Sequence, residues 1–394
     1  MSKLTPREKF MAAVNLEKNV PAPCCFMLYK GLLMNCTNYI EFLQSQLQMG
    51  LEPYAMIPPR LPIVKNDSYN LHGMEVHLDP NVEIKEWIEE RDGERFPVMV
   101  KEYSTPAGRL RTEVRQTDDW RWGNHIPLFD DYISPRAIKY IINGSEDLNA
   151  LRFFLCAPSA REIEALRTES EETINFARRN DLPLVGGWGV GADMLGWIYG
   201  FEQMVFASLD QPAFLHEILR IIADWNQTRM RVLLDMGIDL YIKRTWYETC
   251  NFWSPKTFEK FIAPILKEDI DICHAAGVKF GCIATDKAMP LLKYYSQLGV
   301  DVLIGMDPHT YDLQKTKEIL KGKVCLWGGV NGHLTVEMGS EKQTREETRN
   351  ALEVLGADGG FILSPVDNVR DDTQLSRKNV EALIDEWKKH YPNG

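Results

Sequence analysis

The sequence lacks the features that mark several classes of protein. No run of about 18 apolar residues occurs in it, so we expect no membrane-spanning helix. The opening MSKLTPREKFMAAVNLEK contains no apolar core of signal-peptide length, and we therefore expect a cytoplasmic protein. No GxGxxG joins a strand candidate to a helix candidate, and no GxxxxGK(S/T) is present. These absences argue against a doubly wound nucleotide-binding sheet.

Positive charge and cysteine are also scarce. The chain has 45 Lys and Arg against 56 Asp and Glu, which gives a formal net charge of -11. Nucleic acids and anionic membranes bind basic surfaces, so we expect neither as a partner. Eight cysteines in 394 residues, with no CxxC pair, are too few for a disulfide scaffold. We expect most of them to be buried thiols.

The second half of the chain alternates between short apolar runs and amphipathic segments. The apolar runs predict strands at 184–187, 240–245, 278–283, 302–306, 324–328 and 360–363. The segments between and after them predict helices at 203–236, 255–276, 287–298, 313–320, 344–355 and 378–390. Such alternation is typical of a parallel sheet covered by helices. The number of units favours an α/β fold of the (β/α)8 TIM-barrel type.

The first part of the chain adds three elements to this barrel. Thr5 can cap a first helix over 5–18, with Pro6 at its first position. A strand candidate follows at 22–28. Two β-rich arms around a Pro-Ala-Gly turn predict an inserted β-hairpin at about 95–117. We expect one barrel domain over 1–394 that carries this insertion.

Reactive groups of a parallel barrel lie just after the carboxyl ends of its strands. At these positions the sequence offers catalytic candidates, namely Arg244, Tyr247, Glu248 and Asp307. It also offers candidates for substrate binding, namely Trp188, Trp246, His309, Asn331 and His333. Several aromatic side chains at strand ends would line a flat apolar pocket, which favours a planar or aromatic substrate.

Cys282, at the end of the strand candidate 278–283, has three interpretations. It could be a packed thiol, or a nucleophile with His309 or His333 as its base. It could also bind zinc together with Glu248 and Asp367, leaving one position open. Glu248 itself has two interpretations. Burial among aromatic residues would raise its pKa toward use as a general acid, whereas a salt bridge to Arg244 or Lys243 would make it structural.

Several segments resemble a known family. They are LTPREKFMAAVNLEK, GWIYGFEQM, SPKTFEKFIAPILKEDIDICHAAGVKFGC, WGGVNGHLTVEMGS and GGFILSPVDN followed by KNVEALIDEW. Over residues 4 to 389 the chain is similar to the uroporphyrinogen decarboxylase superfamily, whose fold is a (β/α) barrel. True decarboxylases of this superfamily have an arginine-rich N-terminal motif. The matching stretch here, PAPCCFMLYKGLLMN, contains no arginine. The resemblance therefore favours the branch of cobamide-dependent methyltransferases, which includes the methyltransferase components of O-demethylases.

The resemblance also implies a set of zinc ligands that this chain has only in part. The methyltransferase branch shows His-x-Cys at a strand end, where this chain has Phe280-Gly281-Cys282. A further cysteine follows the last strand of the family, where this chain has Asp367. The resemblance thus implies either a rearranged zinc site with Cys282, Glu248 and Asp367, or no metal. The cobalamin would come from a separate corrinoid protein, since the chain has no Asp-x-His-x-x-Gly motif.

Three functions follow as hypotheses. In the first, the chain is the methyltransferase component of a corrinoid system and moves a methyl group between a small methoxylated aromatic substrate and a partner's cobalamin. In the second, it is a metal-independent decarboxylase or lyase that uses Arg244, Tyr247 and Asp307. In the third, it is a barrel that binds a ligand without catalysis. The chain could assemble as a homodimer in each case.

Overall fold

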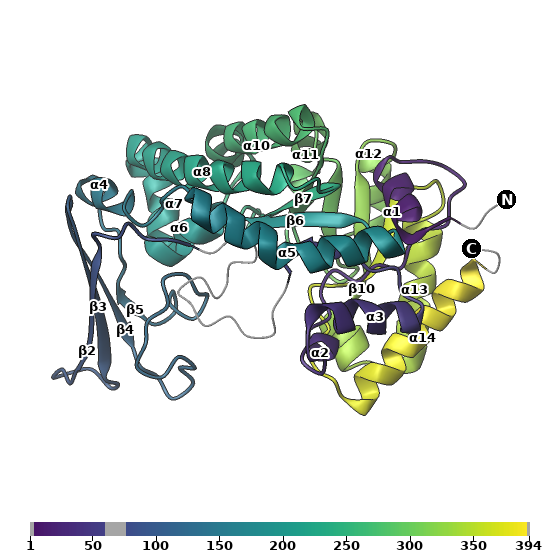
Figure 1. The fold of residues 1–394 in the computed structure, drawn as a ribbon, viewed down its shortest axis with the longest axis horizontal. Helices are drawn as coiled ribbons and strands as arrows, with labels where there is room; N and C mark the ends of the chain where they lie inside the picture. Colours follow the sequence, from purple (N-terminus) through teal and green to yellow (C-terminus); the bar gives the residue numbers. More distant parts are fainter. Residues whose placement is uncertain (1–3, 60–75, 392–394) are drawn as a thin grey trace.

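A computed structural model describes residues 4–59 and 76–391 and shows a curled parallel sheet surrounded by helices (Figure 1). Seven strands pair in the order β1-β6-β7-β8-β9-β10-β11. Their bounds are β1 Ala55–Ile57, β6 Leu184–Gly189, β7 Leu240–Arg244, β8 Lys279–Ile283, β9 Val302–Met306, β10 Cys325–Asn331 and β11 Phe361–Val366. Six of them coincide with the strands predicted from the apolar runs. The α/β barrel expected from the sequence is confirmed.

The predicted strand at 22–28 occupies the gap between the first and last strands of this sheet. Cys24 forms a parallel bridge with Leu363 of β11, and the Cys25 N–H donates to the Leu363 carbonyl at 3.0 Å. On the other side, the Glu52 N–H donates to the Cys24 carbonyl at 2.9 Å, three residues before β1. A short extended segment therefore takes the eighth position of the barrel. Strand β1 is only three residues long, and the sequence analysis did not predict it.

The predicted helices occur in the predicted order, with four differences. Helix α6 Ala192–Ile198 was not predicted, the first helix ends at Val14 instead of at residue 18, and the helix expected over 255–276 is interrupted by the π turn η2 Phe258–Ile262. The single helix expected over 203–236 is two helices, because Pro212 has no N–H to continue the first and occupies the first position of the second. The helices between and after the later strands are α6 Ala192–Ile198, α7 Phe201–Asp210, α8 Pro212–Leu234, α9 Pro255–Thr257, α10 Ala263–Ala275, α11 Leu292–Leu298, α12 Leu313–Leu320, α13 Glu341–Leu355 and α14 Gln374–His390. Short turns of 3-10 or π type are η2 Phe258–Ile262, η3 Met289–Leu291 and η4 Gly332–Glu337.

The first part of the chain supplies the remaining helices. These are α1 Pro6–Val14, α2 Lys30–Leu33, α3 Tyr39–Met49, α4 Leu148–Leu151 and α5 Ala160–Asn180, with the turn η1 Ser145–Asp147 before α4. Thr5 caps α1 through a capping box with Glu8, as the sequence predicts for this position. Across 4–59 and 76–391, no helix combines the length and the apolar character needed to cross a membrane.

The inserted hairpin is the centre of a second, antiparallel sheet. Strands β3 Val98–Thr105 and β4 Gly108–Arg115 form the expected hairpin, and β2 Glu83–Glu89 and β5 Ala137–Lys139 pair with its two edges. This sheet stands apart from the two chain termini, next to helices α6 and α7 (Figure 1). The chain returns from it along α6, where the Ile142 N–H donates to the Ile198 carbonyl at 2.9 Å. The insertion therefore lies at the carboxyl end of β6. The expectation of one domain over 1–394 stays a prediction.

Candidate active site at the barrel mouth

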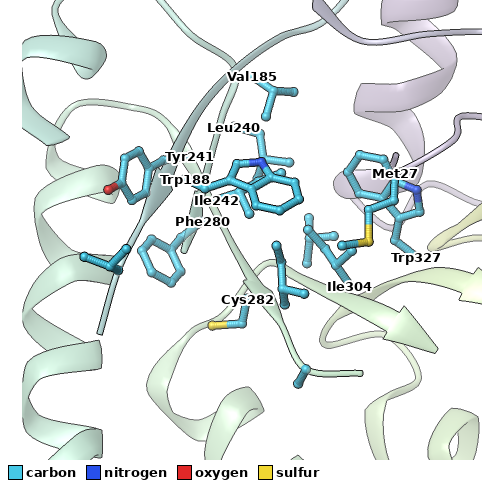
Figure 2. Close-up of a cluster of buried hydrophobic side chains, with 14 of the residues drawn as sticks. Met27, Val185, Trp188, Leu240, Tyr241, Ile242, Phe280, Cys282, Ile304 and Trp327 are labelled. Atoms are coloured by element: carbon cyan, nitrogen blue, oxygen red, sulfur yellow. The ribbon is translucent and has the colours of Figure 1, made fainter. Parts of the chain in front are cut away.

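The barrel mouth is the open end at the carboxyl ends of the parallel strands. A strand side chain can reach it only from the inner face of the sheet, so the face on which each residue lies has to be established first. Lys243 of β7 pairs in register with Cys282 of β8, and Tyr241 pairs with Phe280. Register partners in a parallel sheet point to the same side. Lys243 binds Asp269 of helix α10 at 2.8 Å, so this side faces the helices. Figure 2 shows Tyr241, Phe280 and Cys282 together on one side of the strands.

The predicted zinc set is not assembled, because Asp367 does not join Cys282 and Glu248 in one group of donors. Cys282 is fully buried in the helix-facing layer, where burial first and then the charge of Glu248 raise the pKa of its thiol. Asp367 lies in the turn after β11 and forms an ion pair with Arg370 at 2.7 Å. Within the described ranges, no three His, Cys, Asp or Glu side chains gather into a group that could hold a metal ion. The donor set does not fit zinc, and we derive no step through a metal.

Cys282 should therefore be dispensable for turnover. A buried thiol with a raised pKa has little thiolate and little access to reagents. Replacing Cys282 with alanine should leave kcat/KM within about twofold, while stability falls by about 1 kcal/mol, the usual effect of a single substitution. In native protein, an aromatic disulfide reagent should modify the partly exposed Cys36, Cys156 and Cys250 before Cys282. A loss of activity in the alanine variant with unchanged folding would contradict this placement.

Arg244 is the last residue of β7 and the neighbour of the helix-facing Lys243, so it points to the other side. Its Nε lies 2.9 Å from Asp193 Oδ2 at the start of α6, and both side chains are nearly fully buried. The guanidinium carbon lies 4.5 Å from the ring centre of Trp246 and 5.0 Å from that of Trp197. Cation–π attraction to the two indoles and the ion pair with Asp193 together hold the guanidinium in one orientation.

The aromatic candidates gather around this arginine. Trp188 and Trp246 meet edge to face, with ring centres 5.6 Å apart. The Tyr247 hydroxyl donates to Asp131 Oδ1 at 2.9 Å, and the Trp197 indole N–H donates to the same oxygen at 2.7 Å. Burial and the charge of Asp131 raise the pKa of Tyr247, so its hydroxyl keeps its proton at neutral pH. These residues form the Arg244 site: an oriented cation, hydrogen-bond donors and flat apolar rings.

A second group of candidates lies after β9 and β10. Asp307 accepts hydrogen bonds from Asn331 Nδ2 at 2.7 Å and from the His309 N–H at 2.8 Å. His309 Nε2 pairs with Glu347 Oε1 at 3.0 Å. Burial raises the pKa of the Asp307 carboxyl. The structure therefore brings together Asp307, His309 and Asn331, as expected from adjacent parallel strands.

Two candidates lie away from these groups. His333 is in the turn η4, more than half exposed, and pairs with Glu337 at 2.7 Å. Glu248 is buried in the helix-facing layer, where its Oε1 accepts the Ala192 N–H at 3.0 Å. The salt bridge to Lys243 considered for Glu248 is taken by Asp269, although the Lys243 charge still acts on the Glu248 carboxyl. Glu248 thus stabilises the first turn of α6 from the helix-facing side of the barrel wall.

Three residues of the Arg244 site had no assigned role in the sequence analysis, namely Asp131, Asp193 and Trp197. Asp193 lies shortly after β6, and this position is the signal that could have placed it at the mouth. Asp131 lies in residues 116–144, which lead from β4 through β5 back to the barrel and form the return segment of the insertion. It does not follow the end of a strand directly. No local pattern connects it with Trp197 or Tyr247, because the contact depends on how the insertion packs against α6.

Comparison with known proteins agrees with this architecture. Residues 133–390 match the family model "Uroporphyrinogen decarboxylase (URO-D)". The chain belongs to the URO-D family. A curated uroporphyrinogen decarboxylase from Protochlamydia amoebophila is 22% identical over 271 residues, which cover 65% of this chain and 68% of that protein.

A solved methyltransferase structure shows the same fold. A methyltransferase from Methanosarcina mazei superposes with a TM-score of 0.59 at 16% identity, covering 99% of this chain and 100% of the other. A B12-independent methionine synthase from Shewanella sp. W3-18-1 gives a TM-score of 0.45 at 11% identity, covering 89% and 85% of the two chains. The family model and the curated relative carry the name of a decarboxylase, whereas the structural neighbour is a methyltransferase, so the reaction of this chain has to be argued from its own site.

Proposed function

We propose that this chain is the methyltransferase component of a corrinoid-dependent system and takes a methyl group from a small methoxylated aromatic compound. The observation that carries the proposal is the Arg244 site. A cation fixed by Asp193 and packed against Trp246 and Trp197 suits an aromatic ring with an oxygen that becomes negative during the reaction. The fold shared with a methyltransferase is consistent with this choice but does not identify the reaction.

The residues of the chain would act on the ether oxygen. When present, the corrinoid of a partner protein supplies the nucleophile that accepts the methyl group. The bond between the methyl carbon and the oxygen breaks, and its electron pair stays on the oxygen. Arg244 would stabilise this negative charge, while Trp188 and Trp246 hold the ring. Asp307, whose pKa is raised by burial, is the carboxyl group best suited to deliver a proton afterwards.

The direct test is methyl transfer from a panel of methoxylated aromatic compounds to cob(I)alamin, free or on candidate corrinoid proteins. Formation of methylcobalamin is followed by its visible spectrum. Transfer that requires this chain supports the proposal, and its absence over a broad panel contradicts it.

Replacing Arg244 with glutamine should lower kcat/KM for methyl transfer by about 100-fold. Losing one charged hydrogen bond to the developing oxyanion accounts for about 1.5 to 3 kcal/mol. Lysine should restore part of the rate, since it keeps the charge without the planar fork. Arg220 of α8, which pairs with Glu268 on the outside of the barrel, provides the matched control, and its glutamine variant should keep the full rate. Equal rates for the two glutamine variants would remove Arg244 from the mechanism.

Decarboxylation is the second candidate, and it is favoured by the family membership of the chain. The same guanidinium could bind a substrate carboxylate, and Asp307 could protonate the carbon after loss of carbon dioxide. Release of carbon dioxide from small aromatic acids, with no need for a corrinoid, would favour this reaction over methyl transfer.

A further inference from the structure

Asp131 is an exposed carboxylate whose hydrogen-bond donors are buried in the barrel. One oxygen of Asp131 accepts both the Trp197 indole N–H at 2.7 Å and the Tyr247 hydroxyl at 2.9 Å. Trp197 is 1% exposed, and Tyr247 is mostly buried. Asp131 belongs to the return segment of the insertion, whereas both donors belong to segments that follow barrel strands. A carboxylate of the insertion therefore contacts the Arg244 site of the barrel.

The donors of Asp131 are the same residues that surround Arg244. The guanidinium lies against the Trp197 ring, and Tyr247 is three residues further along the chain from Arg244. The negative charge of Asp131 also raises the pKa of Asp193, the ion-pair partner of Arg244, although burial is the larger cause. An indole N–H and a phenol O–H that meet at one point, next to a ring packed against a guanidinium, are a suitable binding place for an anion. In this structure the Asp131 carboxylate accepts from both of these donors.

The return segment has other attachments to α6 that do not involve Asp131. Ser134 Oγ donates to the Gly196 carbonyl at 3.0 Å, and the Ile142 N–H donates to the Ile198 carbonyl at 2.9 Å. Asp130, next to Asp131, is buried and pairs with Arg121 at 3.1 Å. These contacts hold the segment in place, so Asp131 can leave its donors by a local change without the insertion detaching.

We propose that Asp131 is an internal occupant of a carboxylate-binding subsite and that the carboxylate of the substrate displaces it. Together with the proposed function, on which this step rests, the inference narrows the substrate to a methoxylated aromatic carboxylic acid. The aromatic ring would lie against Trp188 and Trp246, and the acid group would take the donors that Asp131 now uses. Ligand entry would then be coupled to release of this contact between the insertion and the barrel.

Binding of 3-methoxybenzoate and of the uncharged 3-methoxybenzyl alcohol tests the subsite without any corrinoid. Intrinsic tryptophan fluorescence and calorimetry give the dissociation constants. Replacing Asp131 with asparagine removes a competing charge and a repulsion, so the carboxylate should bind about tenfold more tightly, which corresponds to about 1.4 kcal/mol. Alanine at this position should give at least the same gain. The alcohol should bind equally well to the wild type and to both variants.

Asp119 provides the matched control, because it is another carboxylate of the insertion and pairs with Arg136 on the surface. Its asparagine variant should bind 3-methoxybenzoate as the wild type does. The proposal is overturned if 3-methoxybenzoate binds to none of the proteins, or if both Asp131 variants, shown to be folded by thermal unfolding, bind it no more tightly than the wild type. Tighter binding without methyl transfer would support the subsite and contradict the proposed reaction. Methyl transfer by the wild type, with 3-methoxybenzoate bound no more tightly by the Asp131 variants, would support the proposed reaction and contradict the subsite.

Discussion

Replacing Lys243 with methionine should lower the free energy of unfolding by about 3 to 5 kcal/mol, the usual result of removing one partner of a buried ion pair. The Lys243 ammonium lies 2.8 Å from Asp269 Oδ2, and both side chains are almost completely shielded from water. Burial lowers the pKa of Lys243, but Asp269 and Glu248 raise it by more, so the ammonium is charged in the folded protein. Without it, the Asp269 carboxylate would remain buried and without a cation. Urea unfolding followed by circular dichroism measures the difference.

Lys267 offers a matched control on the same helix as Asp269. It pairs with Asp271 four residues later, and about half of each side chain is exposed. Replacing Lys267 with methionine should change stability by no more than about 0.5 kcal/mol, because water screens exposed pairs. The double variant Lys243→Met with Asp269→Leu should recover most of the lost stability, since it leaves no unpaired charge. If Lys243→Met is no more destabilising than the control, the buried pair does not hold α10 to the barrel wall.

The order of strands and helices could be predicted because buried parallel strands are continuous apolar runs. The strand from Leu240 and the strand from Val302 begin in the structure where the pattern indicates. The pattern fails for β1, whose three residues are too few to show a period. Strand β1 is positioned by its pairing with β6 in the closed barrel and by no local signal.

The sequence predicts less about the candidate site than about the order of strands and helices. The sequence predicts that Cys282 and Arg244 lie at strand ends, and they do. It does not predict on which face they lie, because a shift of one residue exchanges the two faces of a strand. Lys243 and Arg244 are both charged, so neither marks the inner side by polarity. The long-range pair of Lys243 with Asp269 decides the question in favour of Arg244, and only the folded chain contains that contact.

Replacing Glu248 with glutamine should stabilise the protein increasingly as the pH rises. Glu248 is 2% exposed, and among the described residues its Oε2 has no hydrogen-bond partner. Burial raises the pKa of this carboxyl above its usual 4.5, against the opposing effects of Lys243 and the Ala192 N–H. Asp193 and Asp269 add to the rise. The neutral acid is therefore the form that folding favours, and a neutral amide of the same shape should replace it well.

The sign of the pH dependence follows from this raised pKa. Below pH 4.5 the carboxyl is protonated in both the folded and the unfolded chain, and its favourable contribution is complete. Between 4.5 and the raised pKa only the unfolded chain ionises, so the wild type loses about 1.4 kcal/mol per pH unit relative to the glutamine variant. Urea unfolding of both proteins from pH 4 to pH 8 gives this difference, in which the other titrating groups cancel. Alanine at the same position should be less stable by about 1 to 3 kcal/mol, because the Ala192 N–H loses its acceptor. If the gain in unfolding free energy of the glutamine variant over the wild type stays constant or falls as the pH rises, Glu248 is ionised in the folded chain and pairs with Lys243 as a carboxylate.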